Sequence, residues 1–142
     1  MNLDFFNRFQ PLAQFAMRLA LGVILIAHGY HKVFGGFHRH MEMVGSLGLP
    51  SWMAFLSAGT EFFGGMGLIL GLFTRLFALF VLGEMGVVIC KVHFRNGLTG
   101  QGGYEFPLAL AMIALALLCF GGGPWAFHFG KSASGAGKAK KG

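Results

Sequence analysis

The chain has 142 residues, of which 55% are hydrophobic and 11% charged, and its mean hydropathy is +0.65. This composition leaves too little polar surface for a water-soluble globule of this size, so the excess apolar surface requires lipid as its solvent. The formal net charge of +6 does not indicate nucleic acid, because the lysines and arginines are scattered between apolar runs and gather only near the C-terminus. Anionic lipid headgroups are the better counterpart for this charge.

Four apolar segments are long enough to cross a membrane as helices, since a hydrocarbon core of about 30 Å needs about 20 helical residues. The segments cover residues 12–30, 52–72, 75–93 and 105–125. The last is the weakest because the glycines and proline at 121–124 interrupt it. The connection Phe73-Thr74-Arg75 is so short that the second and third helices must form an antiparallel hairpin. The sequence therefore predicts an all-α integral membrane protein, an antiparallel four-helix bundle with both termini on the same side.

Residues 1–128 are expected to form one membrane domain, followed by a flexible, cytoplasmic tail rich in Lys and Gly at 129–142. The first apolar run lacks an Ala-x-Ala end and should remain attached as the first membrane helix. The side predicted to carry the termini holds Arg8, Arg75, Lys131, Lys138, Lys140 and Lys141. The opposite side holds Lys32, Arg39, Lys91 and Arg95. This excess of positive charge favours cytoplasmic termini.

Three ionisable residues fall inside the predicted spans, namely Arg18, Glu61 and Glu84. Counted from the predicted span ends at 1.5 Å per residue, all three lie roughly 14 Å below the same membrane face. An isolated charge at that depth costs at least about 2.5–3.5 kcal/mol, so we expect Arg18 to pair with Glu61 or with Glu84. The group is interpreted either as a structural ion-pair cluster or as a ligand or proton site, because two carboxylates beside one arginine leave an unbalanced negative charge.

A second polar layer lies at the membrane surface on the side of the first loop. It consists of His28, His31, Lys32, His38, His40, His93 and Glu105. His28 and His93 are expected at comparable depth, as two axial haem ligands would be. Interfacial histidines and lysines, however, commonly extend toward lipid headgroups. Neither haem nor a metal is therefore expected. The segment His38-Arg39-His40 is predicted to lie in a solvated loop.

The two cysteines, Cys90 and Cys119, are predicted to be buried and inert. They are expected roughly 20 Å apart in depth, which is too far for a disulfide. Any thiol chemistry would therefore come from a partner or a small molecule.

The order of several short motifs resembles the DoxX family of bacterial membrane proteins, from about residue 15 to residue 125. These motifs are Arg18-Leu19-Ala20-Leu21-Gly22, His28-Gly29 with Lys32, Gly48-Leu49-Pro50, Glu61-Phe62-Phe63-Gly64-Gly65, Leu70-Gly71-Leu72-Phe73-Thr74-Arg75, and Asn96-Gly97 followed by Gly103-Tyr104-Glu105-Phe106-Pro107. The positions that match the family pattern are Arg18, His28, Lys32, Glu61, Arg75 and Glu105. Glu84 and the pair His38 and His40 have no counterpart in that pattern.

The resemblance implies a four-helix protein of the bacterial inner membrane, related to the small subunits of thiosulfate:quinone oxidoreductase. The first functional hypothesis is a redox-associated subunit that binds quinone near Arg18, Glu61 and Glu105 and works with a thiol or sulfur oxidoreductase. The alternative is a non-catalytic membrane anchor or accessory subunit of a larger complex, which the absence of a nucleophile or cofactor motif favours. Association of several copies of the chain into a homo-oligomer is a further alternative. The residues expected at a ligand site or ion-pair cluster are Arg18, Glu61, Glu84, Glu105, His28 and Lys32.

Overall fold

The structure, a computed structural model, describes residues 3–127, and within this range it contains helices, turns and loops but no β-strand. The first long helix consists of the short 3-10 helix η1 (Asp4–Phe9) and α1 (Gln10–Phe34). Helix α1 has Pro11 in its first turn, where a backbone amide hydrogen would have no partner within the helix, and Gly35 follows its last residue. The flexible tail predicted for 129–142, together with His128, lies outside the described residues.

The loop predicted between the first two spans contains a helix, α2 (Phe37–Ser46). The second long helix runs without a break through α3 (Trp52–Gly59), the π-helical turn η2 (Thr60–Gly64) and α4 (Gly65–Leu70). The third runs through α5 (Thr74–Val88), the π-helical turn η3 (Ile89–His93) and the 3-10 turn η4 (Phe94–Asn96). The last helix is α6 (Glu105–Phe120).

Three of these helices, Asp4–Phe34, Trp52–Leu70 and Thr74–Asn96, are long and apolar enough to cross a membrane. The fourth, α6, has 16 residues and ends earlier than predicted because Gly121 adopts a φ of 80°. The predictions of an all-α fold and of a membrane protein are confirmed. The fourth crossing and the membrane side of the termini stay predictions.

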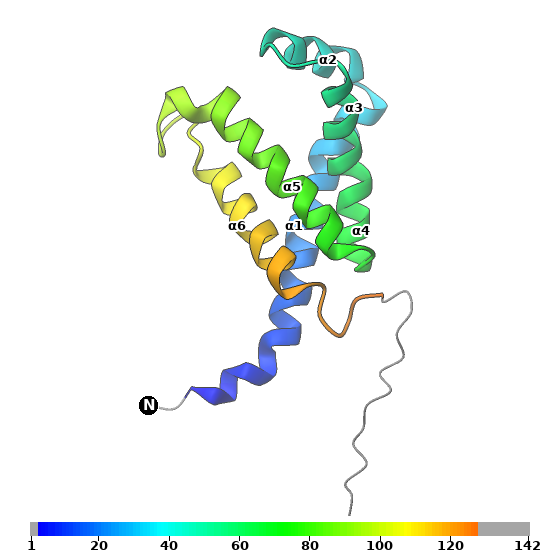
Figure 1. The fold of residues 1–142 in the computed structure, drawn as a ribbon, viewed down its shortest axis with the longest axis vertical. Helices are drawn as coiled ribbons and strands as arrows, with labels where there is room; N and C mark the ends of the chain where they lie inside the picture. The colour runs from blue at the N-terminus through cyan, green and yellow to red at the C-terminus, as the bar shows by residue number, and fades with distance from the viewer. Residues whose placement is uncertain (1–2, 128–142) are drawn as a thin grey trace, which may run out of the picture.

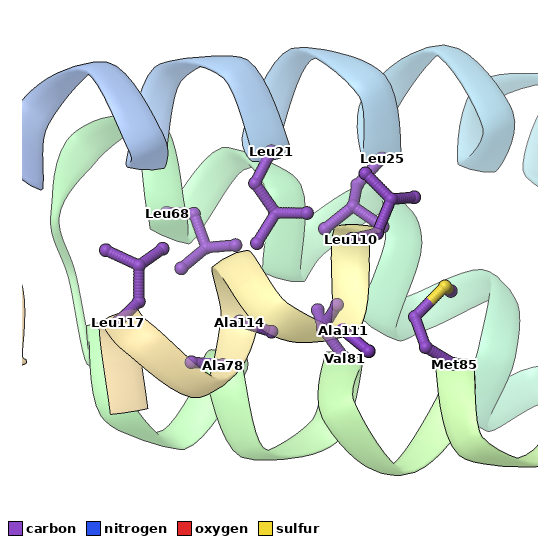
Figure 2. Packing of buried hydrophobic residues seen from close by; sticks show 10 residues of the cluster. All are labelled: Leu21, Leu25, Leu68, Ala78, Val81, Met85, Leu110, Ala111, Ala114 and Leu117. Atoms are coloured by element: carbon purple, nitrogen blue, oxygen red, sulfur yellow. The ribbon is translucent and has the colours of Figure 1, made fainter. Parts of the chain in front are cut away.

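The core lies where α1, α4, α5 and α6 face one another (Figure 2). It consists of Leu21, Leu25, Leu68, Ala78, Val81, Met85, Leu110, Ala111, Ala114 and Leu117. Small alanines fill the contact between α5 and α6, so these two helices approach closely. Large apolar side chains such as Val23, Phe63, Leu79 and Met112 remain exposed on the outer surface. This surface is suited to lipid contact.

Glycines set the register between α1 and the second long helix. A Cβ atom on Gly22 would lie 2.7 Å from the carbonyl oxygen of Gly65, and one on Gly29 would lie 2.6 Å from the amide nitrogen of Phe62. Either distance is shorter than atoms tolerate, so both positions require glycine for the helices to pack this closely. The contact fixes Gly29 beside Glu61, and thereby decides which side chains of α1 reach the second helix.

The second and third long helices are joined by the short segment Gly71–Phe73, in which Gly71 and Phe73 both have positive φ, 75° and 46°. From this turn α4 with α3 and α5 diverge toward the end of the molecule that carries α2 (Figure 1). The turn therefore lies at one end of the bundle, and the space between α3 and α5 widens toward the other.

Candidate ligand-binding site

An ion pair between Lys32 and Glu61 joins α1 to the second long helix. Lys32 Nζ lies 2.7 Å from Glu61 Oε1, and the two side chains are 24% and 7% exposed. The close contact of Gly29 with the Glu61 backbone, one helical turn before Lys32, brings the lysine within reach. Because the pair is largely removed from water, its two charges stabilise each other far more than a surface pair would.

Ser57 extends this pair to a third helix. Lys32 Nζ donates to Ser57 Oγ at 3.3 Å, and Ser57 Oγ donates to Glu84 Oε1 at 2.5 Å. The resulting network Glu61–Lys32–Ser57–Glu84 connects α1, the second helix and α5, with one ammonium group facing two carboxyl groups. The second oxygens, Glu61 Oε2 and Glu84 Oε2, are buried and have no hydrogen-bond partner within the described part of the chain.

Glu61 lies in the π-helical turn η2, where Thr60, Glu61 and Gly64 are all buried. A π-helical turn inserts extra width into a helix and turns successive side chains to directions that a regular α-helix would not give them. Such turns are frequent at functional sites because the altered direction aims a polar group inward. Here it places the Glu61 carboxyl against α1 while Ser57, four residues earlier, reaches α5.

A cavity of about 220 Å³ lies beside the network, between α2, α3 and α5. Its polar lining residues are Lys32, His40, Ser57, Thr60 and Glu84, and the remaining lining is aliphatic or aromatic apart from Gly83. Leu79 and Phe80 line the cavity and are also exposed on the outer surface of α5. A few polar groups in a largely apolar pocket are typical of small-molecule sites.

His40 lines this cavity, which corrects the prediction that it lies in a solvated loop. Helix α2 is amphipathic: it buries His40 and Val44, four residues apart, and exposes His38 and Arg39. His40 Nε2 has no partner among the described residues. Burial, together with the positive charge of Lys32, lowers the pKa of His40 from its ordinary value of 6.5, so the imidazole is held neutral.

Arg18 does not belong to this network, so the expected pairing with Glu61 or Glu84 is wrong. It is fully buried, and Nη2 donates to the carbonyl oxygen of Trp125 at 3.0 Å. Its side chain packs against Gly71, which follows the C-terminal end of the second helix. The first helix continues to Phe34, beyond its predicted end, so Lys32 faces Glu61, and Arg18 lies about 21 Å away along α1.

The remaining candidates lie outside the network. Glu105 is exposed at the first residue of α6. His28 Nδ1 bonds to the carbonyl oxygen of Ile24 at 2.8 Å, and His93 Nδ1 bonds to that of Gly102 at 2.6 Å. In the described part of the chain, no three His, Cys, Asp or Glu side chains are grouped as a metal site would need.

The cysteines also differ from the prediction of burial. Cys90 and Cys119 are both free and exposed on the outer surface of their helices. Cysteine is usually buried in a water-soluble protein, but here the outer surface contacts lipid, so an apolar thiol can lie there without cost.

Sequence reasoning missed three of the polar residues beside the cavity, Ser57, Thr60 and His40. Ser57 stands four residues before Glu61, on the same face of a helix, and this spacing is a signal that could have marked it. Thr60 carries no comparable signal. His40 could have been found from the apolar spacing of α2, since Val44 follows it by one turn.

Comparison with known proteins agrees with this architecture. The family model DoxX matches residues 13–94, which include most of α1, the second helix and most of the third, and all four residues of the network. The chain is 35% identical over 115 residues to a Bacillus subtilis (strain 168) protein named "Putative oxidoreductase CatD", covering 78% of this chain and 82% of that protein. No solved structure matches the chain. The chain therefore belongs to the DoxX family.

Proposed function

We propose that this protein is the membrane subunit of a quinone-linked oxidoreductase and that the cavity between α2, α3 and α5 binds the quinone ring. The observation that carries the proposal is the combination of an apolar cavity of about 220 Å³ with three members of the network, Lys32, Ser57 and Glu84, at its wall. A quinone ring is flat and apolar with polar oxygens at its edge, which matches such a lining. Its isoprenoid tail would remain in the bilayer beside Leu79 and Phe80.

The hydrogen-bonding capacity of the network favours the reduced, hydroxyl-bearing form of the ligand. Lys32 already donates to Glu61 and to Ser57, whereas Glu84, which lines the cavity, has its Oε2 without a donor within residues 3–127. A quinol hydroxyl can donate to such an oxygen, but a quinone carbonyl can only accept. An ionised Glu84 therefore makes a hydrogen bond with quinol that it does not make with quinone, so quinol should bind more tightly when this carboxyl is ionised.

The same network can exchange protons with the bound ring. Reduction of a quinone to a quinol takes up two electrons and two protons, and carboxyl groups near the ring oxygens can deliver or accept those protons. We propose that the electrons are exchanged with a partner oxidoreductase that acts on thiols or sulfur compounds. The name of the Bacillus subtilis relative, "Putative oxidoreductase CatD", supports a redox role for the complex.

The proposed setting is the bacterial inner membrane, with four antiparallel crossings and cytoplasmic termini. The three helices of spanning length and the positive residues near the termini support this arrangement. In this orientation α2 and the cavity lie toward the opposite face, where a partner outside the cytoplasm could contact the loops.

The test is a binding titration of the full chain in nanodiscs with decyl-ubiquinone and with decyl-ubiquinol. Gly83 lines the cavity, and a Cβ atom there meets nothing within 4 Å, so Gly83→Leu should extend a side chain into the cavity and abolish binding. Gly86→Leu is the matched control, because Gly86 is equally unobstructed but does not line the cavity. If neither redox form binds the unaltered protein, the quinone proposal is overturned and a membrane anchor becomes the better interpretation.

A further inference from the structure

Arg18 is a buried cation that has no counter-ion among the described residues. The side chain is fully buried, and its one hydrogen bond, from Nη2 to the carbonyl oxygen of Trp125, leaves Nε and Nη1 without a partner in the described part of the chain. No carboxylate within residues 3–127 pairs with it. A buried guanidinium without an anion is costly, although the C-terminal ends of α4 and α6 nearby offset part of its charge.

Thr74 supplies a second unpartnered polar group in the same place. Its Oγ1 is buried and has no hydrogen-bond partner in the described chain. A Cβ atom on Gly122 would lie 2.7 Å from Thr74 Oγ1 and 2.6 Å from Cβ of Ala126. A Cβ atom on Gly71 would collide with Arg18 Nη1 and lie 2.7 Å from the same Cβ of Ala126. Ala126 therefore covers both Arg18 and Thr74.

The cover is residues 121–127, here called the strap, which follows α6 and is not helical. Its glycines approach the helices closely, since a Cβ atom on Gly122 would lie 2.7 Å from Thr74 Oγ1 and one on Gly123 2.6 Å from Gln14 Oε1. Arg18 also donates to the carbonyl oxygen of Trp125, whose ring packs edge-on against Phe15 with ring centroids 5.7 Å apart. Gln14 Nε2 donates to the carbonyl oxygen of Phe120, the residue before the strap, at 3.4 Å. Because the strap is not helical, it can move away from Arg18 without unwinding a helix.

We propose that Arg18 and Thr74 form a binding site for a phosphate group and that the strap closes this site when it is empty. The unpartnered N–H groups of Arg18 and the Thr74 hydroxyl are donors, and phosphate oxygens accept several hydrogen bonds while they neutralise the buried charge. Arg75, which donates to the carbonyl oxygen of Cys119 at 3.3 Å, adds positive potential beside the strap. The phosphate comes from the headgroup of an anionic phospholipid or from free phosphate, which present the same chemistry.

The location suits a headgroup. Thr74 is the first residue of α5 and Phe120 the last of α6, so the site lies at the end of the bundle, where lipid phosphates are found. It is separated from the Lys32–Glu61 pair by about 15 Å along the second helix, because Gly71 packs on Arg18 and Gly29 packs on Glu61, ten residues earlier in that helix. The phosphate proposal is therefore independent of the quinone proposal.

The experiment uses the fluorescence of Trp125 in the full chain. The sequence contains two tryptophans, so Trp52→Phe leaves Trp125 as the reporter. The protein in dodecyl maltoside, a detergent without phosphate, is titrated with short-chain phosphatidylglycerol and, separately, with inorganic phosphate. We expect the emission of Trp125 to shift to longer wavelength as the strap opens, and the thermal unfolding temperature to rise.

Variants decide whether Arg18 is responsible. Arg18→Gln should weaken the response at least about tenfold, because it removes the charge-assisted hydrogen bonds. Arg8→Gln is the control, since Arg8 is exposed with its guanidinium 3.7 Å above the ring centre of Phe5. If Arg18→Gln does not fold, Thr74→Val should still weaken the response several-fold. A response to inorganic phosphate alone identifies free phosphate, and one only to phosphatidylglycerol identifies lipid. No response to either anion, or an unchanged response in both Arg18→Gln and Thr74→Val, overturns the proposal.

Discussion

Removal of Lys32 should be the most damaging single change in the network, because its partner is the more deeply buried of the two. Glu61 is 7% exposed and the Lys32 side chain 24%. At 2.7 Å, two unit charges in an effective dielectric constant of about 20 attract by roughly 6 kcal/mol before desolvation is subtracted. Lys32→Met leaves Glu61 buried and unpaired, so we expect the free energy of unfolding to fall by about 3–5 kcal/mol.

Glu61→Gln should lower the free energy of unfolding by less, about 1–2 kcal/mol, because Lys32 keeps its hydrogen bond to Ser57 and can extend toward the surface. The double variant Lys32→Met/Glu61→Gln no longer buries an unpaired charge at this pair. Its free energy of unfolding should therefore be about 2 kcal/mol higher than the sum of the two single changes predicts. The assay is reversible unfolding of the full chain in bicelles, with Lys91→Met as the control at an exposed lysine. Additivity within about 0.5 kcal/mol would refute the reasoning, since it would mean that the two side chains do not depend on each other.

Two further predictions concern helix packing and pH. Gly29→Ala should lower the free energy of unfolding by more than about 2 kcal/mol, because the new Cβ would meet the Phe62 amide nitrogen at 2.6 Å. Gly86→Ala, whose Cβ meets nothing within 4 Å, should be neutral or stabilising in the same unfolding assay, and equal effects would contradict the packing account. The lowered pKa of His40 means that the unfolded chain binds a proton more readily, so stability is full above about pH 6.5 and falls below it. His40→Gln should flatten this pH dependence, whereas His38→Gln at the exposed position should not, and an unchanged slope in His40→Gln would disprove the assignment.

Much of the architecture follows from the order of residues alone. Apolar runs of about 20 residues form helices in lipid because only a helix satisfies every backbone hydrogen bond within one segment. The family resemblance, carried by motifs around Arg18, Glu61 and Arg75, likewise needs no coordinates. The sequence also marked Lys32, Glu61 and Glu84 as candidates, since ionisable groups in or beside such runs are rare.

The partners of these groups were decided by tertiary structure. The sequence alone suggested that Arg18 would neutralise Glu61, because the end of the first helix was placed too early. The contact of Gly29 with Glu61 sets the actual register, so Lys32 takes the carboxylate and Arg18 faces the strap. Composition and periodicity report which face of a helix is apolar, but not how far one helix slides along its neighbour. That displacement depends on the fit of individual side chains across the interface, which exists only once the helices are packed.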